Sequence, residues 1–232
     1  MRIDKFICDC LGVSRSEAKN LIKNGKVELN GSRVSSSDLK FDESKAEVFV
    51  NGEALTYEKY VYFMLNKPAG LVSATKDSAP TVIDLFKNEN RKNLFPVGRL
   101  DKDTLGLLIV TDDGDLGHHL TSPKHHVDKT YRVTIRTPLS ADDIKALESG
   151  LDIGEGEVSG PAKVTVVDEE TILLTISEGK YHQVKRMLEA VGNKVLLLKR
   201  ISIGGVTLDD NLKEGEYRRL TPSELDILND NI

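Results

Sequence analysis

The amino-acid sequence predicts an α+β fold in two parts. A small α/β module over residues 1–58 precedes a larger domain over residues 59–232, whose sheet is mixed, mainly antiparallel and flanked by helices. Three observations indicate this arrangement. The start of the chain shows helical periodicity and then a hairpin signal, the remainder is rich in short strand-like apolar runs, and few strand–helix–strand repeats are visible. A doubly wound parallel sheet is therefore not expected.

The module opens with two predicted helices. Apolar residues of the first helix recur at i, i+3, i+4 and i+8 and stop before Gly12: Ile3, Phe6, Ile7 and Leu11. A capping box from Ser14 to Glu17 predicts the start of the second helix. Three residues form the apolar face of that helix: Ala18, Leu21 and Ile22. Asn24-Gly25 is typical of a left-handed helix end.

A hairpin and a third strand complete the module. Residues 26–29 and 32–34 flank Asn30-Gly31, which is a strong signal for a type I′ turn. Residues 46–50 read as a further strand. The segment 51–59 is polar and lacks periodicity, so we interpret it as the linker to the second domain.

Basic residues gather on one face of the second helix. Arg15, Lys19 and Lys23 recur every four residues, and Arg2 and Lys5 precede them in the first helix region. A basic helix face is often only a solvated surface. The same face also suits a polyanion, because Lys and Arg side chains pair with phosphate groups. Composition alone leaves both interpretations open.

The larger domain is predicted from apolar runs that read as strands: 60–65, 107–110, 131–135, 172–176 and 195–200. Residues 66–70 are expected to form a turn, with a return strand starting at 71–73, and residues 111–115 to form a second turn. A helix is expected after Gly179, with an inward stripe of Val184, Met187, Leu188 and Val191. Gly204 and Gly205 are expected to permit close approach of backbones.

Composition limits the class of protein. A net charge of −5 argues weakly against nucleic acid, yet six Lys or Arg against two acids between Glu178 and Arg200 form a local basic belt. No apolar run approaches the roughly 20 residues that span a bilayer, and no signal-peptide core follows Met1. The spacing of Cys8 and Cys10 suits neither a disulfide nor a complete zinc site. We expect a cytoplasmic protein that does not bind membranes.

A metal site is not expected either. Asp101, Asp103 and Asp112 fit a calcium loop only in part, because one ligand position of that loop is apolar. The histidine pairs 118–119 and 125–126 lack ligands at chelating spacing and are assigned to the surface or to RNA contact. No glycine-rich phosphate loop or serine-nucleophile elbow occurs. An enzyme of this sequence would therefore work without a nucleotide, flavin, metal or other cofactor.

Asp101 is the leading candidate for chemistry. It stands beside Arg99 on a glycine-preceded bend before the buried strand 107–110, which places one carboxylate at the rim of a sheet. Burial raises the pKa of a carboxyl group, and a cation within about 4–6 Å lowers it again. Lys185, just after the first turn of its helix, is the candidate cation, and Arg186 is expected to contact phosphate. Solvated cations on an amphipathic helix are the open alternative.

Three motifs together resemble the active-site set of the RNA pseudouridine synthases: Gly98-Arg99-Leu100-Asp101, Lys129-Thr130-Tyr131, and the run from Gly179 to Arg186. The resemblance is closest to the ribosomal small-subunit branch and extends over nearly the whole chain. Residues 1–48 are similar to the RNA-binding module of ribosomal protein S4. The resemblance implies the pseudouridine synthase fold behind an S4-like module.

The resemblance also implies roles for the catalytic residues. Asp101 would be the carboxylate that lets uracil detach from C1′, rotate and rejoin through C5. Tyr131 would stack on the flipped uracil and assist with the C5 proton. Lys185, at a place where the family often has arginine, would keep Asp101 ionised and oriented. The expected RNA contacts are Arg2, Lys5, Arg15, Lys19, Lys23, Arg99, His182, Gln183 and Arg186.

The implied substrate is one uridine of 16S ribosomal RNA, at position 516 of its usual numbering, either in naked RNA or in a small-subunit assembly intermediate. The protein is expected to be a monomer. Two alternatives stay open: the same chemistry on 23S ribosomal RNA, and a ribosome-assembly protein that binds RNA without catalysis. Asp101 separates the last reading from the others, because a pure binder gains nothing from a carboxylate that faces phosphates.

Overall fold

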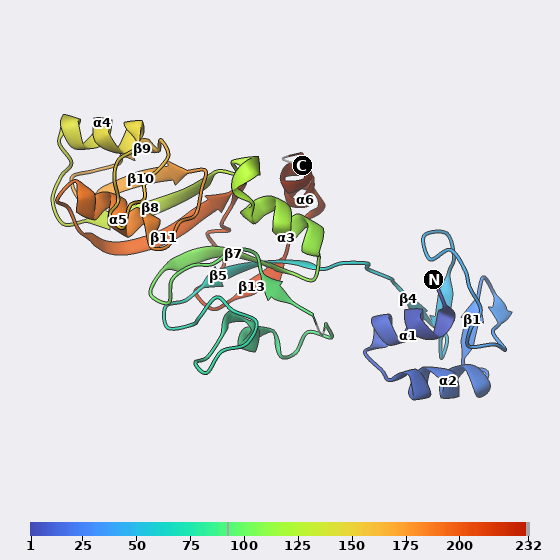
Figure 1. Ribbon diagram of the computed structural model, residues 1–232. Coiled ribbons are helices and arrows are strands. Elements are labelled where there is room, and N and C mark those ends of the chain that lie inside the picture. The colour runs from blue at the N-terminus through green and yellow to red at the C-terminus, as the bar shows by residue number, and fades with distance from the viewer. Residues whose placement is uncertain (92, 231–232) are drawn as a thin grey trace. The chain divides into compact units, whose positions relative to one another are not determined.

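The computed structural model describes residues 1–91 and 93–230 and separates into two compact units (Figure 1). The first comprises Met1–Tyr60 with residues 88–91, and the second comprises Val61–Lys87 with residues 93–230. The sequence-based boundary after residue 58 lies two residues from this division. Within the described residues, no helix combines the length and apolarity that crossing a bilayer requires.

The first unit packs two helices on a small antiparallel sheet of strand order β2-β1-β3-β4. Its elements are α1 (Ile3–Leu11), α2 (Arg15–Lys23), β1 (Val27–Leu29), β2 (Ser32–Arg33), β3 (Val48–Val50) and β4 (Glu53–Leu55). The predicted capping box at Ser14 is present, and so is the left-handed Gly25 with φ +68°. Ile3, Phe6 and Ile7 are buried as expected, whereas Leu11 is exposed.

One element of the first unit was not anticipated. The segment 51–59, interpreted as a linker, contains β4, which pairs with β3. The turn between them is Asn51-Gly52, and both residues have positive φ (54° and 83°). This is the same dipeptide that marks the first hairpin, so the polar composition concealed a turn signal that the sequence does contain.

The second unit contains one sheet of nine strands, counted over the described residues, with order β13-β5-β7-β11-β8-β10-β9 and with β6 and β12 at its sides. The strands are β5 (Tyr62–Lys67), β6 (Phe95–Pro96), β7 (Leu105–Thr111), β8 (Lys129–Ile135), β9 (Lys163–Val166), β10 (Thr171–Ile176), β11 (Val195–Ile203), β12 (Val206–Thr207) and β13 (Tyr217–Arg219). The helices are α3 (Gly114–Thr121), α4 (Ala141–Ser149), α5 (Gln183–Ala190) and α6 (Pro222–Asn229), with 3₁₀ turns at Val82–Phe86 and Pro123–His125.

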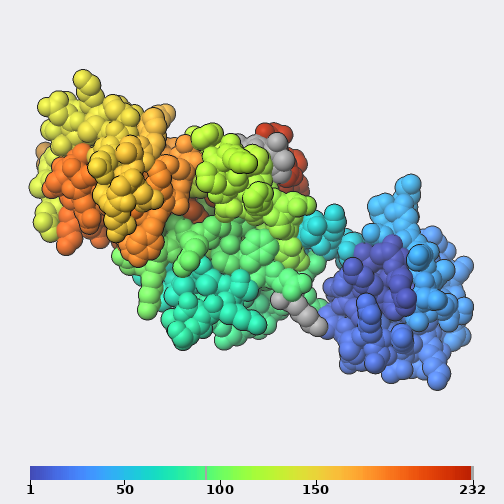
Figure 2. Space-filling model, in the orientation of Figure 1, coloured from blue at the N-terminus to red at the C-terminus, as the bar shows by residue number. Residues whose placement is uncertain are grey.

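The sheet is mainly antiparallel, as predicted, because its named strand pairs are antiparallel except for β7 with β11. It separates two cores by the two-residue period of strands. On β7, Leu108 and Val110 face the core that contains α4 and α5, whereas Leu107 and Ile109 face the core that contains α3 and α6. Along the sheet, the part that contains β5 and β7, drawn in cyan to green, adjoins the part that contains β9 to β11, drawn in yellow to orange (Figures 1 and 2).

Three local predictions for this unit need correction. The first strand runs Tyr62–Lys67 instead of 60–65, so Lys67 belongs to the strand and not to the turn. Residues 71–73 form no strand and contribute only the isolated bridge of Val72 to Thr81. The expected turn at 111–115 is the start of α3, because the Asp113 side chain accepts hydrogen bonds from the amides of residues 115 and 116 and so caps a helix.

The glycine that a close backbone approach requires is Gly106. It stands at the parallel pair of β7 with β11, has φ +100°, and an added Cβ would lie 2.2 Å from the carbonyl oxygen of Arg200. Gly204 and Gly205 instead form the tight β11–β12 turn with φ of 56° and 86°. Arg200 is 2% exposed, and its Nε donates to the carbonyl of Leu107 over 2.8 Å, which ties β11 to β7 again.

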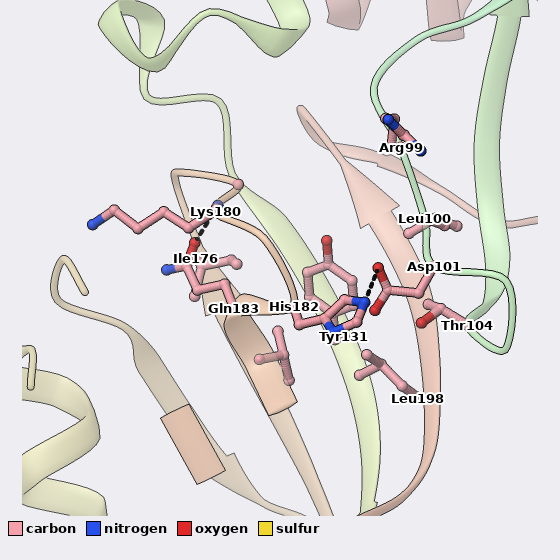
Figure 3. Close-up of a pocket in the computed structure, with 12 residues that line it drawn as sticks. Arg99, Leu100, Asp101, Thr104, Tyr131, Ile176, Lys180, His182, Gln183 and Leu198 are labelled. Atoms are coloured by element: carbon pink, nitrogen blue, oxygen red, sulfur yellow. Dashed lines mark hydrogen bonds and ion pairs between the residues drawn. The ribbon is translucent and has the colours of Figure 1, made fainter. Parts of the chain in front are cut away.

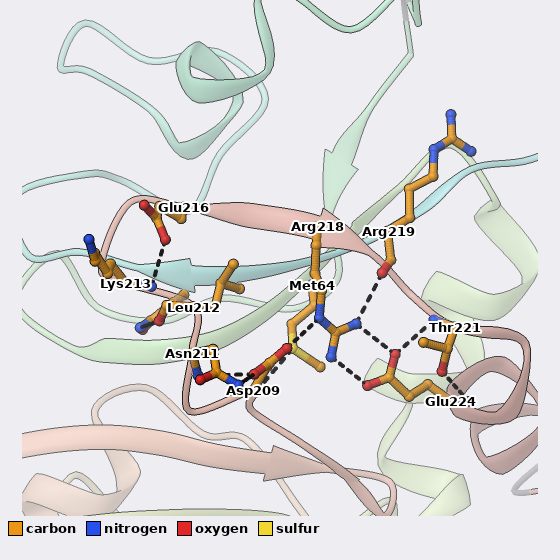
Figure 4. Close-up of polar contacts among 11 residues, drawn as sticks. Met64, Asp209, Asn211, Leu212, Lys213, Glu216, Arg218, Arg219, Thr221 and Glu224 are labelled. Carbon is orange, nitrogen blue, oxygen red and sulfur yellow. Dashed lines mark hydrogen bonds and ion pairs between the residues drawn. The ribbon is translucent and has the colours of Figure 1, made fainter.

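A charged network holds the C-terminal part of the chain on the sheet (Figure 4). The guanidinium of Arg218 on β13 forms ion pairs with Asp209 and with Glu224 of α6, each at 2.8 Å. The hydrogen bond to Glu224 is the largest influence that raises the pKa of Arg218 above its usual value. Glu224 also completes the capping box of α6 with Thr221. One arginine thus joins a strand, a loop and a helix.

A buried lysine lies under the loop that carries Asp101. Lys67 has no exposed surface, and its Nζ donates to the carbonyls of Pro68 (3.0 Å), Lys102 (3.3 Å) and Thr104 (2.9 Å). Burial lowers its pKa to about 8, against the opposing effect of nearby carboxylates. The carbonyls of this loop therefore have a fixed donor beneath them.

Gly106→Ala is expected to destabilise the second unit by on the order of 3 kcal/mol, because the new Cβ meets backbone atoms at a left-handed position. Gly114→Ala is the matched control, since an added Cβ there meets open space at the start of α3. Urea unfolding monitored by circular dichroism measures both. Equal unfolding midpoints for the two variants would contradict this account of the β7–β11 junction.

Lys67→Met is expected to lower the unfolding free energy by an amount that depends on pH. The pKa of Lys67 is about 8 in the folded protein and 10.5 in its usual state. Between these two pH values the unfolded chain therefore binds more protons than the folded protein. The contribution of Lys67 to the unfolding free energy thus increases as pH rises from 8 to 10.5. Methionine has no such contribution. The difference in unfolding free energy between native protein and variant should thus grow from pH 7.5 to pH 10, and a constant difference would show that the ammonium is not desolvated.

Candidate active site

The loop between β6 and β7 presents Asp101 to a pocket (Figure 3). Besides Lys67, two anchors hold this loop. The hydroxyl of buried Ser73 donates to the Leu100 carbonyl (2.9 Å) and accepts from the Leu100 amide (3.1 Å). The amide of Gly70 donates to the Lys102 carbonyl over 2.7 Å. The segment 66–73 is therefore the support that fixes the backbone on both sides of Asp101.

Two basic side chains from the start of α5 meet the Asp101 carboxylate. Lys185 Nζ lies 3.2 Å from Oδ2, and His182 Nε2 lies 3.5 Å from Oδ1. Lys185 also donates to both oxygens of Asp103, at 2.7 and 2.9 Å. The side chains of Asp101 and Lys185 are 28% and 21% exposed, so the carboxylate is partly screened by protein but open to a ligand. The structure thus brings Asp101 and Lys185 together, as the sequence analysis expected.

The electrostatics of this cluster favour the charged forms of Lys185 and Asp103. Burial lowers the pKa of Lys185, but its hydrogen bonds to Asp103 and Asp101 outweigh burial, and the pKa is raised above its usual value. The hydrogen bond from Lys185 is the largest cause that lowers the pKa of Asp103. The lysine therefore stays protonated and supplies a permanent positive charge beside Asp101.

Tyr131 forms the floor of the pocket. It lies within β8, third residue of the strand, and is 7% exposed, so it packs into the core with one part open to the pocket. In Figure 3 its ring lies beneath His182 and beside Asp101. Thr104, Ile176, Val184 and Leu198 contribute to the remaining wall. An aromatic floor with walls of mixed apolar and polar side chains and one carboxylate suits a planar, partly polar ring such as a nucleobase.

The expected RNA contacts in this unit fall into two groups. Arg99 is exposed and lines the pocket on the Asp101 loop, and His182 touches Asp101 as described. Gln183, in contrast, is 4% exposed, accepts from the Lys180 amide (2.9 Å) and donates to Glu178 (2.5 Å). It serves to start α5, so its assignment to RNA contact needs correction.

Arg186 is also occupied by the protein. Its guanidinium donates to Glu157 (2.5 Å) and to the carbonyls of Ile153 (2.9 Å), Gly154 (2.7 Å) and Tyr181 (3.2 Å). The side chain is 13% exposed. It braces α5 against the 153–157 turn with most of its donors, and its contact with phosphate stays a prediction.

The basic residues of the first unit lie mostly at its surface. Lys5, Arg15, Lys19 and Lys23 are exposed, whereas Arg2 is paired with buried Asp4 at 2.7 Å. Lys19 and Lys23 line a surface hollow together with residues that the sequence analysis did not include: Arg33, Ser35 and Ser37. The hairpin brings these three beside α2, a proximity that no local pattern predicts.

The sequence analysis missed the support of Asp101. Lys67 and Ser73 lie 34 and 28 residues before it, in a segment read as a turn and a strand start. The available signal was a lysine two residues after the apolar run 60–65, since a lysine is costly to bury without partners. His119 was placed at the surface or in RNA contact but is 6% exposed, on the buried face of α3.

No group of three or more His, Cys, Asp or Glu side chains among residues 1–91 and 93–230 is placed to hold a metal ion. Neither Cys8 nor Cys10 takes part in a disulfide. The side chains gathered at the pocket are one carboxylate (Asp101), a lysine cation and an imidazole beside it, and an aromatic ring.

Comparison with known proteins agrees with this geometry. The sequence profile of the RNA pseudouridylate synthase family matches residues 61–190, and that of the S4 domain matches residues 1–45. The chain is 47% identical to the "Uncharacterized RNA pseudouridine synthase YtzG" of Bacillus subtilis (99% of both chains). It is 46% identical to the "Ribosomal small subunit pseudouridine synthase A" of Haemophilus influenzae (98% of this chain and 99% of that protein).

A solved structure supports the same conclusion. The protein of a "Crystal structure of pseudouridylate synthase" is 45% identical to this chain, covers 98% of it over 99% of its own length, and superposes with a TM-score of 0.70. The resemblance inferred from the three motifs is thereby confirmed. The chain belongs to the RNA pseudouridylate synthase family and carries an S4 domain at its N-terminal end.

Proposed function

We propose that the protein isomerises one uridine of ribosomal RNA to pseudouridine, and that this RNA is the 16S RNA of the small subunit, with position 516 as the target. Family membership supports the reaction, and several relatives named as ribosomal small-subunit synthases, at 42–46% identity, support the choice of RNA. The observation that carries the proposal is the partly exposed Asp101 carboxylate, which lies 3.2 Å from Lys185 and lines the same pocket as Tyr131.

The reaction breaks the bond from uracil N1 to C1′, rotates the base and forms a bond from C5 to C1′. The hydrogen on C5 is then lost and N1 gains a proton, so the product is an isomer of the substrate. Asp101 supplies the carboxylate that promotes the breakage. Its position at the pocket rim, on a backbone anchored by Ser73 and Lys67, orients it before the RNA arrives.

Lys185 acts on Asp101 and not on the base. With its raised pKa it remains a cation 3.2 Å from the Asp101 carboxylate, where it balances the negative charge and orients the side chain. Asp103 shares the lysine and limits its motion. An exposed ion pair contributes at most about 1 kcal/mol to stability, so the role of this cluster is orientation and charge instead of folding.

Tyr131 receives the extruded base. A base stacked on an aromatic ring gains roughly 1–3 kcal/mol. This offsets part of the few kcal/mol lost when a nucleotide leaves its stack. The buried position of Tyr131 in β8 keeps its ring fixed, so little further ordering is needed on binding.

The S4 unit docks on folded RNA. Exposed Arg15, Lys19 and Lys23 lie along α2 as a stripe of positive charge, which suits phosphate contact without reading of bases. Because the net charge of the protein is −5, RNA binding depends on a local cluster of positive charge such as this stripe.

Asp101→Asn is expected to abolish isomerisation while leaving RNA affinity within about twofold, because the amide keeps the shape but lacks the charge. Release of tritium from 16S RNA carrying C5-tritiated uridine measures turnover, and filter binding measures affinity. Asp103→Asn is the matched control, since it removes a carboxylate that touches the same lysine but is 73% exposed, and it should retain most activity.

Full turnover by the Asp101→Asn protein would refute its catalytic role. If the native protein released no tritium from naked 16S RNA, the same assay on a small-subunit assembly particle would follow. Release from 23S RNA alone would move the target to that RNA. If no tritium were released from naked 16S RNA, the assembly particle or 23S RNA, an RNA-binding assembly protein without catalysis would be favoured.

Replacing Arg15, Lys19 and Lys23 by Gln is expected to weaken RNA binding and to reduce the slope of log affinity against log salt by about 2 to 3, because each phosphate contact releases about one counterion. Gln at three other exposed lysines makes the same change in net charge as a control: Lys45, Lys145 and Lys163. An equal loss of slope in both triple variants would show that overall charge, and not the α2 stripe, drives binding.

A further inference from the structure

Tyr181 is an aromatic side chain that packing leaves in solvent. It is 73% exposed, the largest exposure among the large apolar side chains of the described residues. Its ring is stacked face to face on the imidazole of His182, with ring centroids 3.8 Å apart and planes 20° apart. The outer face of an exposed tyrosine ring stays in contact with water unless a ligand or partner covers it.

The ring beneath Tyr181 belongs to the active site. His182 lies directly before α5 in the left-handed conformation (φ 49°, ψ 32°), which a residue with a Cβ adopts at a cost. This conformation directs Nε2 to 3.5 Å from Asp101 Oδ1 while the imidazole face meets Tyr181. One imidazole therefore separates the exposed tyrosine from the catalytic carboxylate.

The backbone that carries Tyr181 is held firmly. The Tyr181 carbonyl accepts from the Arg186 guanidinium over 3.2 Å, and the Lys180 amide donates to Gln183 over 2.9 Å. The Lys180 ammonium pairs with Glu178 at 3.2 Å. Arg186 and Gln183, which were expected to contact RNA, thus support the segment that presents the ring.

We propose that Tyr181 is a stacking platform for the nucleobase next to the target uridine in the RNA. The proposal rests on the proposed function, because it places a neighbouring nucleotide beside the pocket that receives the uracil. Stacking on a ring tolerates any base, and purines, with the larger face, are favoured. The base beside the extruded uridine has lost one stacking neighbour, and Tyr181 replaces that neighbour.

Three proteins test the platform. Tyr181→Leu keeps an apolar side chain but removes the ring, Tyr181→Phe restores the ring, and Val158→Ala removes another exposed apolar side chain, 62% exposed, as the control. In tritium-release kinetics, Tyr181→Leu is expected to raise KM about tenfold with kcat changed less than threefold, and Phe to recover KM. Because the side chain is exposed, the thermal midpoints of all three should match that of the native protein.

A binding readout makes the test independent of turnover. In an Asp101→Asn background, RNA with 2-aminopurine beside the target should lose fluorescence on binding when Tyr181 is present and not when Leu replaces it. An abasic nucleotide at that neighbouring position should abolish the affinity difference between the Tyr and Leu proteins. A tenfold difference that persists with the abasic RNA, an unchanged KM, or a loss confined to kcat would each overturn the platform.

The outcomes separate the two proposals. If native protein releases no tritium from any ribosomal RNA while the fluorescence change depends on Tyr181, the proposed reaction fails and the platform holds. If tritium is released equally by the native and the Leu proteins at all RNA concentrations, the reaction holds and the platform fails.

Discussion

The second unit depends on one junction, the parallel pair of β7 with β11. Gly106 permits it, because any Cβ there would meet the Arg200 backbone, and the buried Arg200 guanidinium ties the same strands through the Leu107 carbonyl. Asp101 precedes β7, whereas Tyr131 and α5 belong to the half of the sheet beyond β11. The pocket lies where these two halves meet, so the geometry of the site follows from the way the sheet is joined.

The Asp101 loop has a rigid support beneath it, and the side chains that contact the Asp101 carboxylate are partly exposed. Lys67, Ser73 and Gly70 donate hydrogen bonds to backbone carbonyls of the Asp101 loop. This support does not depend on the side chains of the loop that face the substrate. The contacts at its surface are partly exposed and contribute little to stability. Lys185 and His182 therefore serve the carboxylate that they contact and not the folding of the unit.

Several polar residues that a linear motif assigns to the substrate instead build the framework. Gln183 is buried at the start of α5, where it donates to Glu178. Arg186 donates hydrogen bonds to the neighbouring 153–157 turn. Both residues support the backbone that carries the stacked rings of Tyr181 and His182. The motif of eight residues from Gly179 to Arg186 therefore combines two residues that contact the Asp101 carboxylate, His182 and Lys185, with others that hold these two in position.

The sequence by itself determined whatever depends on local patterns. The capping box at Ser14, the turn at Asn30-Gly31 and the buried run of β7 follow from residues a few positions apart, and the motif around Asp101 pointed to its family. Only the tertiary structure decided which distant residues support the site. Lys67 under the loop and the pairing of β7 with β11 join segments far apart in the chain. Local propensity carries no information on such contacts, because packing and the burial of polar groups choose among the arrangements that each pattern allows.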